Sequence, residues 1–189
     1  MRPAAAPASA GIAFRAIAAI EAVTGLVAVI CLFSIMAIVA ADVTMRYAFN
    51  RPFGWSYDLI GTYLMVALFY LVVSGAYRVG AHINVDILHG AMPRRARRFA
   101  DLVTHLVGLG VFLLIALAGW EATAAAYVDG DRLSGAYAWP TWPALGLVPF
   151  GAGLLALRLA LHAVAEVAGI VTGKDYIPAA DRAHAVGTE

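Results

Sequence analysis

Charged residues are scarce in this sequence. They make up 13% of its 189 residues, whereas 62% are hydrophobic. So little polar material cannot cover the surface of a water-soluble domain of this size, which excludes that class of protein. The 13 basic and 12 acidic residues nearly balance, so no positive excess indicates nucleic-acid binding. The composition is that of a membrane protein.

Cysteine and catalytic motifs are as scarce as charge. The single cysteine, Cys31, lies in an apolar run without a partner for a disulfide, so it indicates nothing about the redox compartment. The sequence contains no phosphate-binding loop, nucleophile elbow or zinc-binding helix motif. We therefore expect neither an enzyme nor a cofactor or resident metal.

Long apolar runs are what the sequence has in quantity. A bilayer core of about 30 Å needs about 20 apolar residues in a helix, and four stretches reach that length. We predict an all-α integral membrane protein with four transmembrane helices in one domain, residues 15–172, between mobile cytoplasmic tails at 1–14 and 173–189. The predicted helices cover residues 16–41, 59–77, 102–128 and 144–171.

Basic residues indicate the orientation in the membrane. The connection between the second and third apolar runs contains Arg94, Arg95, Arg97 and Arg98 in close succession. Arginine and lysine concentrate on the cytoplasmic side of membrane proteins, where they also meet anionic headgroups. An even number of helices places both termini on the side of this connection. We therefore predict cytoplasmic N- and C-termini.

Two ionisable residues lie within predicted spans at comparable depth, Glu21 in the first and Arg158 in the fourth. Ionisable residues are costly in a bilayer, and each is a functional candidate by default. We favour an ion pair between helices over a proton path. The alternative is a stand-alone, proton-coupled four-helix exporter that uses Glu21 as its coupling acid.

The connection between the first two spans is polar and aromatic, with the sequence "RYAFNRPFGWSYD". Asp42 and Arg46 are spaced i, i+4, so the first helix is expected to continue past the lipid core. Ser56 is expected to cap the second helix, with Asp58 in its first turn. The aromatic residues predict a belt at headgroup depth, and a docking platform for a partner is the alternative.

Arg78, His82 and Asp86 are spaced i, i+4, i+8 and would share one face of a helical continuation. We expect Arg78 to pair with Asp86 and His82 to bond a neighbouring backbone. A metal site formed by His82, Asp86 and His89 is less favoured, because second-shell partners and a fourth ligand are not evident. A haem protein that uses His82, His105 and His162 is a further alternative, in which two facing histidines would hold the haem and His105 and His162 lie near the inner side of the membrane.

Several motifs together resemble a known family, the small four-helix (Q-type) permease subunit of tripartite ATP-independent periplasmic (TRAP) transporters. They are "RYAF" after the first helix, Trp55 and Asp58 opening the second, "GAYRVGAHINVDIL" after it, "MPRRARR", and proline and tryptophan before a helix containing "VPFG". The motifs are spread over nearly the whole chain apart from its tails.

The resemblance implies a bacterial inner-membrane complex. In such systems a periplasmic binding protein delivers an organic acid to a large multi-helix subunit, which imports it with a sodium gradient. The small subunit enlarges the static scaffold and helps to dock the binding protein. The resemblance assigns roles in architecture and docking to Arg46, Trp55, Asp58, Arg78, His82 and Asp86.

Overall fold

The structure, a computed structural model, describes residues 8–79, 94–172 and 176. This part of the chain is helical and contains no β-strand; an isolated bridge joins Arg132 and Pro140. The helices are α1 (Ala8–Phe49), α2 (Ser56–Asp58), the π-helical turn η1 (Leu59–Leu64), α3 (Met65–Arg78), α5 (Arg94–Val128) and α6 (Trp142–Thr172).

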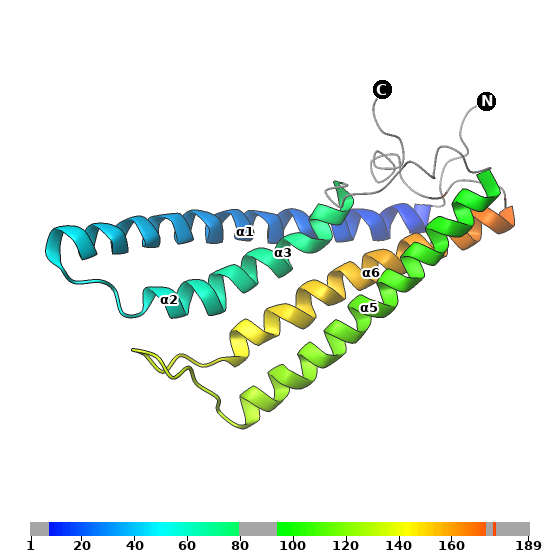
Figure 1. Cartoon of the computed structure of the whole chain (residues 1–189). Coiled ribbons are helices and arrows are strands. Elements are labelled where there is room, and N and C mark those ends of the chain that lie inside the picture. Colours follow the sequence, from blue (N-terminus) through cyan, green and yellow to red (C-terminus); the bar gives the residue numbers. More distant parts are fainter. Residues whose placement is uncertain (1–7, 80–93, 173–175, 177–189) are drawn as a thin grey trace.

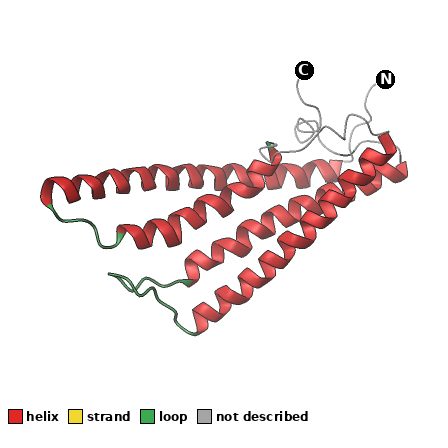
Figure 2. Ribbon diagram, viewed as in Figure 1, coloured by secondary structure: helices red, strands yellow, loops and turns green. Residues whose placement is uncertain are grey.

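Four helical segments are long and apolar enough to cross a membrane. The second of them is a continuous run of α2, η1 and α3. The helices pack in the order α1, α3, α6, α5, so that α6 and α3 form the centre and α1 and α5 the two flanks (Figures 1 and 2). The prediction of an all-helical protein with four spans is confirmed.

The two ends of this array differ. The connections 50–55 and 129–141 lie at one end, which we call the hairpin end (Figure 1). The beginnings of α1 and α5 and the ends of α3 and α6 lie toward the other, which we call the terminal end. The polar contacts between the helices therefore form two groups, one at the hairpin end and one toward the terminal end.

The first helix is longer than the predicted span on both sides. It has 42 residues, a length of roughly 63 Å, and includes residues 8–14, which the sequence analysis assigned to a tail. It ends where Asn50 adopts a positive φ of 53°, a backbone conformation that asparagine tolerates better than most residues. Hydropathy delimits the lipid-embedded part of a helix, whereas the helix itself continues through polar residues.

A narrow seam connects α1 to its neighbours. The buried positions recur at alternating intervals of three and four residues, as in a left-handed coiled coil. Along the first half of the helix they are Phe14, Ile17, Glu21, Thr24 and Ala28, and the half-buried Cys31 continues the series. The remaining positions form a broad apolar face that the described residues leave uncovered.

Glycine allows α3 and α6 to approach closely at the centre. A Cβ atom added to Gly151 would collide with the backbone carbonyl of Tyr70. A Cβ atom added to Gly119 of α5 would come within 2.9 Å of Val148 and 3.1 Å of the Pro149 ring, both on α6. Close backbone contact of this kind favours dispersion packing between helices in a bilayer.

Candidate functional site

The most buried polar contact joins α1 to α6. The guanidinium of Arg158 donates from Nε to Glu21 Oε1 at 2.6 Å and from Nη2 to Oε2 at 2.8 Å. The exposed fractions of the two side chains are 0% and 1%. Glu21 and Arg158, which the sequence analysis paired, therefore form a bidentate ion pair, a geometry that gives strong charge-assisted hydrogen bonds.

Helix α3 completes this site from the other side. Ser74 donates its hydroxyl proton to Glu21 Oε1 at 2.6 Å, and Arg78 Nε lies 3.7 Å from Glu21 Oε2. The predicted partner of Arg78, Asp86, lies outside the described residues, as does His82. One carboxylate on α1 thus receives donors from α3 and α6, and we call this group the Glu21 network.

The Glu21 network is suited to holding helices together and poorly suited to moving protons. Its carboxylate accepts three short hydrogen bonds from Arg158 and Ser74, with a second guanidinium, that of Arg78, close by. A carboxylate so engaged would have to give up these bonds to take a proton. The geometry therefore disfavours the exporter in which Glu21 is the coupling acid.

Next to this network, aromatic rings from all four spans meet around His162 of α6. The His105 ring of α5 stacks on it with centroids 5.2 Å apart and an angle of 17° between ring planes. Phe14 of α1 and Tyr77 of α3 present their edges at 5.3 Å and 5.8 Å. Axial haem ligands instead lie on opposite sides of an iron atom, so this stacked pair does not fit the haem alternative.

At the hairpin end, Asp42 fastens the connection 50–55 to α1. Its carboxylate accepts a hydrogen bond from Arg46 Nη2 at 2.9 Å through Oδ2 and one from the backbone N–H of Phe53 at 2.7 Å through Oδ1. Arg46 also lies 3.5 Å from the hydroxyl oxygen of Tyr57. The i, i+4 spacing of Asp42 and Arg46 thus produces an ion pair, and the same Asp42 carboxylate also fixes the turn that follows α1.

The start of the second span differs from the prediction. Ser56 was expected to cap it, but Ser56 is the first helical residue, and its hydroxyl donates to the backbone carbonyl of Phe53 at 2.9 Å. The capping position is occupied by Trp55, whose side chain makes no capping hydrogen bond and stacks instead on Phe53 with centroids 5.4 Å apart. The Ser56 hydroxyl closes the turn 53–56, because this turn brings the Phe53 carbonyl within hydrogen-bond distance.

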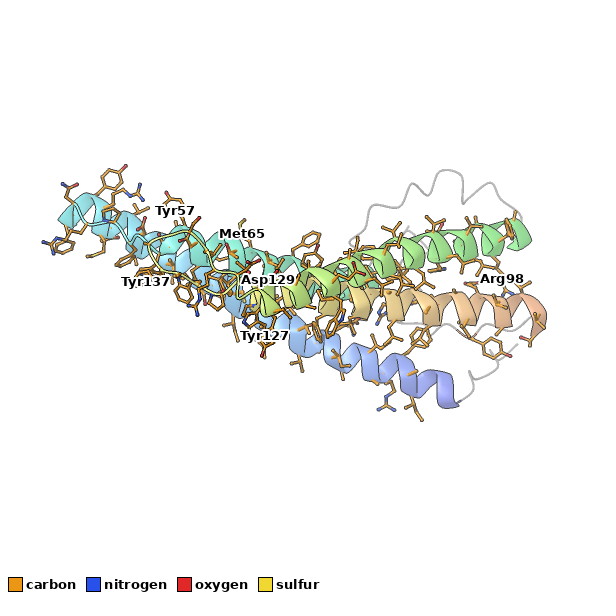
Figure 3. All side chains as sticks on the ribbon, turned by 90° about the horizontal axis from the view of Figure 1, so that it is seen from below. Tyr57, Met65, Arg98, Tyr127, Asp129 and Tyr137 are labelled. Atoms are coloured by element: carbon orange, nitrogen blue, oxygen red, sulfur yellow. The ribbon has the colours of Figure 1, made fainter. Side chains whose placement is uncertain are left out.

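The second connection at this end folds against the start of the second span and against the first connection, where a Cβ added to Gly54 would lie 3.3 Å from Cβ of Ala136. The Asp58 carboxylate lies against the backbone of Gly135, where an added Cβ would collide with it, and Tyr63 donates to the carbonyl of Pro140. Within the connection, Leu133 N–H donates to the carbonyl of Trp139 at 2.8 Å. The two connections therefore form one ordered surface, which we call the hairpin platform. Figure 3 shows Tyr57 and Tyr137 at this end and Arg98 at the opposite end.

The predicted site residues thus fall into separate groups. Arg46, Trp55 and Asp58 lie at the hairpin platform, whereas Arg78 belongs to the Glu21 network. The sequence analysis did not assign roles to Ser74 or Gly135, and neither residue type carries a distinctive signal in an apolar run or a loop. Their roles become apparent only in the folded chain, where Ser74 lies opposite Glu21 and Gly135 lies opposite Asp58.

Four apolar helices, with charges paired inside the array, define a multi-pass helical membrane protein. The family model described as "Tripartite ATP-independent periplasmic transporters, DctQ component" matches residues 35–169. The chain belongs to this family and is thus a small permease subunit of a TRAP transporter. A comparison with curated proteins gives no match. The family is one of transporter components and implies two partners, a large membrane subunit and a periplasmic binding protein.

Proposed function

We propose that this chain is a static accessory subunit of a sodium-coupled TRAP transporter that imports an organic acid across the bacterial inner membrane. It enlarges the scaffold of the large subunit and helps to dock the binding protein. Sodium and substrate bind elsewhere in the complex. In this arrangement the hairpin platform faces the periplasm and the terminal end faces the cytoplasm.

The Glu21 network is the observation that carries this proposal. A transporter site requires polar groups that exchange partners with a substrate or an ion. Here the Glu21 carboxylate is engaged by Arg158 and Ser74 through short hydrogen bonds. In the described part of the chain, no group of three or more histidine, cysteine, aspartate or glutamate side chains is placed to hold a metal ion. These features support a scaffold.

The flanking helices supply the surface for a membrane partner. Buried residues are few on α1 and α5, and their outer faces are apolar along most of each span. On α1 the exposed apolar residues include Val23, Leu26, Ile30, Phe33 and Met36. Such a face is compatible with lipid and equally with close packing against another membrane protein. We expect the large subunit to cover one of these two flanks.

The hairpin platform is the surface proposed for the binding protein. Tyr137 of this platform is 58% exposed, and Tyr47 at the end of α1 and Tyr57 in α2 beside it are 85% and 71% exposed, although the connections are held by internal hydrogen bonds. Exposed tyrosines on ordered backbone lose little conformational entropy on binding, which is favourable at an interface. Ordered loops with exposed aromatic rings support docking as well as a membrane-interface belt.

The first test is a detergent pull-down of the tagged chain from its native membrane. Co-purification of a much larger membrane protein supports the scaffold proposal, whereas recovery of this chain alone, together with transport by this chain alone, would favour the exporter. For docking, Tyr57→Ala with Tyr137→Ala should lower binding-protein-dependent transport while leaving co-purification intact. Tyr127→Ala, which changes an exposed tyrosine of α5, is the matched control.

A further inference from the structure

Glu121 of α5 is an acidic residue within a span. Its side chain is exposed, and no hydrogen bond or ion pair engages its carboxylate within the part of the chain that the structure describes. Arg132, the nearest basic residue in the sequence, donates instead to the carbonyl of Ala138 in the connection 129–141. An ionisable residue within a span is costly unless it finds a partner. The partner of Glu121 is therefore to be sought outside this chain.

The Glu121 carboxylate faces away from the rest of the array. A Cβ added to Gly119 of α5 would lie 2.9 Å from Val148 of α6. Thr123 of α5 likewise lies against α6, where a Cβ added to Gly146 would be 3.6 Å from the threonine methyl group. Glu121 is two residues from both Gly119 and Thr123, and a rotation of about 200° around the helix places it on the opposite side. Because α5 is a flank of the array, this side is its outer face (Figure 1).

Glu121 lies too deep for its carboxylate to reach the lipid headgroups. The Tyr127 ring of α5 packs on Trp142 at the start of α6 with centroids 5.5 Å apart, and such rings gather at the membrane interface. Glu121 precedes Tyr127 by six positions, which places it about 9 Å further into the bilayer. The Cα–Cβ bond of a helical residue tilts toward the helix N-terminus, which for α5 means away from the hairpin end. A glutamate side chain is also shorter than the lysine and arginine stems that reach the interface, so the carboxylate stays at acyl-chain depth.

The residues in line with Glu121 have the spacing of a helix-packing surface. Leu114 and Leu117 are 68% and 54% exposed, and a Cβ added to Gly110 would meet open space. The exposed positions recur at alternating intervals of four and three residues, as in the seam of a left-handed coiled coil. One polar residue in such a seam fixes the register of the two helices. We call this surface the α5 face, and it consists of Gly110, Leu114, Leu117, Glu121, Ala124 and Val128.

The other flank of the array has no comparable residue. Over residues 16–41 of α1 the one charged residue is Glu21, which is buried and held by Arg158. The exposed positions of this stretch are apolar, so lipid alone can cover them. The carboxylate of Glu121 therefore distinguishes the α5 face from the outer face of α1.

The carboxylate also selects the kind of partner. Copies of this chain share one orientation in the membrane, so pairing two α5 faces about a twofold axis would bring two Glu121 side chains together. Like charges repel strongly at this depth, where little water is present to screen them. An arginine or lysine side chain of another membrane protein instead supplies the opposite charge and hydrogen-bond donors.

We propose that the α5 face is the surface on which the large membrane subunit packs, and that a basic side chain of that subunit pairs with Glu121. The inference rests on the proposed function as an accessory subunit and selects one of its two flanks. The apolar residues of the α5 face supply the packing contacts, and the ion pair fixes the register of α5 against the partner helix.

Photo-cross-linking in the native membrane tests the surface. A photoreactive phenylalanine analogue replaces Leu114 on the α5 face or, as the matched control, Phe33 on the outer face of α1, whose exposed fractions are 68% and 65%. We expect a covalent adduct with the large subunit from position 114 and none from position 33. Adducts from position 33, or from neither position although the large subunit co-purifies, would overturn the inference and leave the proposed function in place. Failure of the large subunit to co-purify at all would refute the proposed function and this inference with it.

Substitutions at Glu121 test the pairing. Glu121→Gln should lower the ratio of complexed to free chain on the order of tenfold, because the basic side chain of the large subunit loses its counter-ion. Glu121→Lys should lower this ratio further, since it places two like charges together. Asp129→Asn removes the same charge from an exposed residue just after α5 and should leave the ratio unchanged. A Glu121→Lys complex as abundant as that of the wild type would contradict the pairing.

Folding of the variants is measured separately, on the chain purified alone. The midpoint of thermal unfolding should be the same for the wild type and Glu121→Gln, because no hydrogen bond or ion pair to this carboxylate is present among the described residues. An unchanged midpoint together with loss of the large subunit assigns Glu121 to the interface. A midpoint lowered in the isolated chain would show that the carboxylate acts within the chain, and the inference would be wrong.

Discussion

Glu21→Gln is the substitution that the structure predicts to be most damaging. The amide keeps the size of the carboxylate but removes its charge and turns one oxygen into a donor that faces the guanidinium of Arg158. Both side chains are almost fully buried, with exposed fractions of 1% and 0%. Removing one partner of a buried ion pair costs about 3–5 kcal/mol, because the other charge is left uncompensated.

The assay is thermal unfolding of the full chain, followed by the reaction of a maleimide dye with Cys31, which is partly buried in the folded chain. The amount of chain in membranes is measured alongside. A loss of this size lowers the midpoint by on the order of 10 °C. Glu21→Leu combined with Arg158→Leu should recover most of the lost stability, since a buried ion pair replaced by apolar residues is often neutral or stabilising. Asp129→Asn, an exposed change at the hairpin end, is the control.

Two results would refute this reasoning. One is a Glu21→Gln midpoint indistinguishable from the wild type, which would mean that the carboxylate does not hold the buried guanidinium. The other is a double leucine variant that is no more stable than the single variant, which would mean that the ionic contact is not the source of the loss.

The remaining predictions concern close contacts. Gly151→Ala should destabilise the chain and reduce co-purification of the large subunit, because the added methyl group meets backbone of α3; Gly153→Ala, which has open space, should be tolerated. Gly135→Val should displace the Asp58 carboxylate, which lies against Gly135, and so lower binding-protein-dependent transport. Co-purification of the large subunit, measured in parallel, should stay intact. Asp42→Ala should release the connection 50–55 at a cost of about 1–3 kcal/mol, seen as faster hydrogen exchange of that segment, with no change at 129–141.

The architecture could be predicted from the sequence because apolar runs of spanning length have few alternatives in a bilayer. The ends of the helices could be predicted less well, because hydropathy delimits only the lipid-embedded part, whereas α1 and α5 continue well beyond it through polar residues. Glu21 and Arg158 stood out because charge is rare inside spans.

The contacts made by uncharged residues could not be predicted in the same way. Ser74 completes the Glu21 network only because α3 brings it opposite a carboxylate that lies 53 residues away in the chain. The Phe14 ring of α1 and the two stacked histidines are ordinary members of their helices in the sequence. Their meeting depends on the crossing of α1, α5 and α6, which no local pattern specifies.

The separation of 137 positions along the sequence between Glu21 and Arg158 has a consequence for biogenesis. Synthesis proceeds from the N-terminus, so the carboxylate is in the membrane before the guanidinium has been made. The last helix carries a charge that a lipid environment rejects, and it finds its counter-ion only if the first helix has been inserted correctly. Correct placement of the fourth span therefore depends on the first, because a misplaced first helix leaves the Arg158 guanidinium in the membrane without the Glu21 carboxylate.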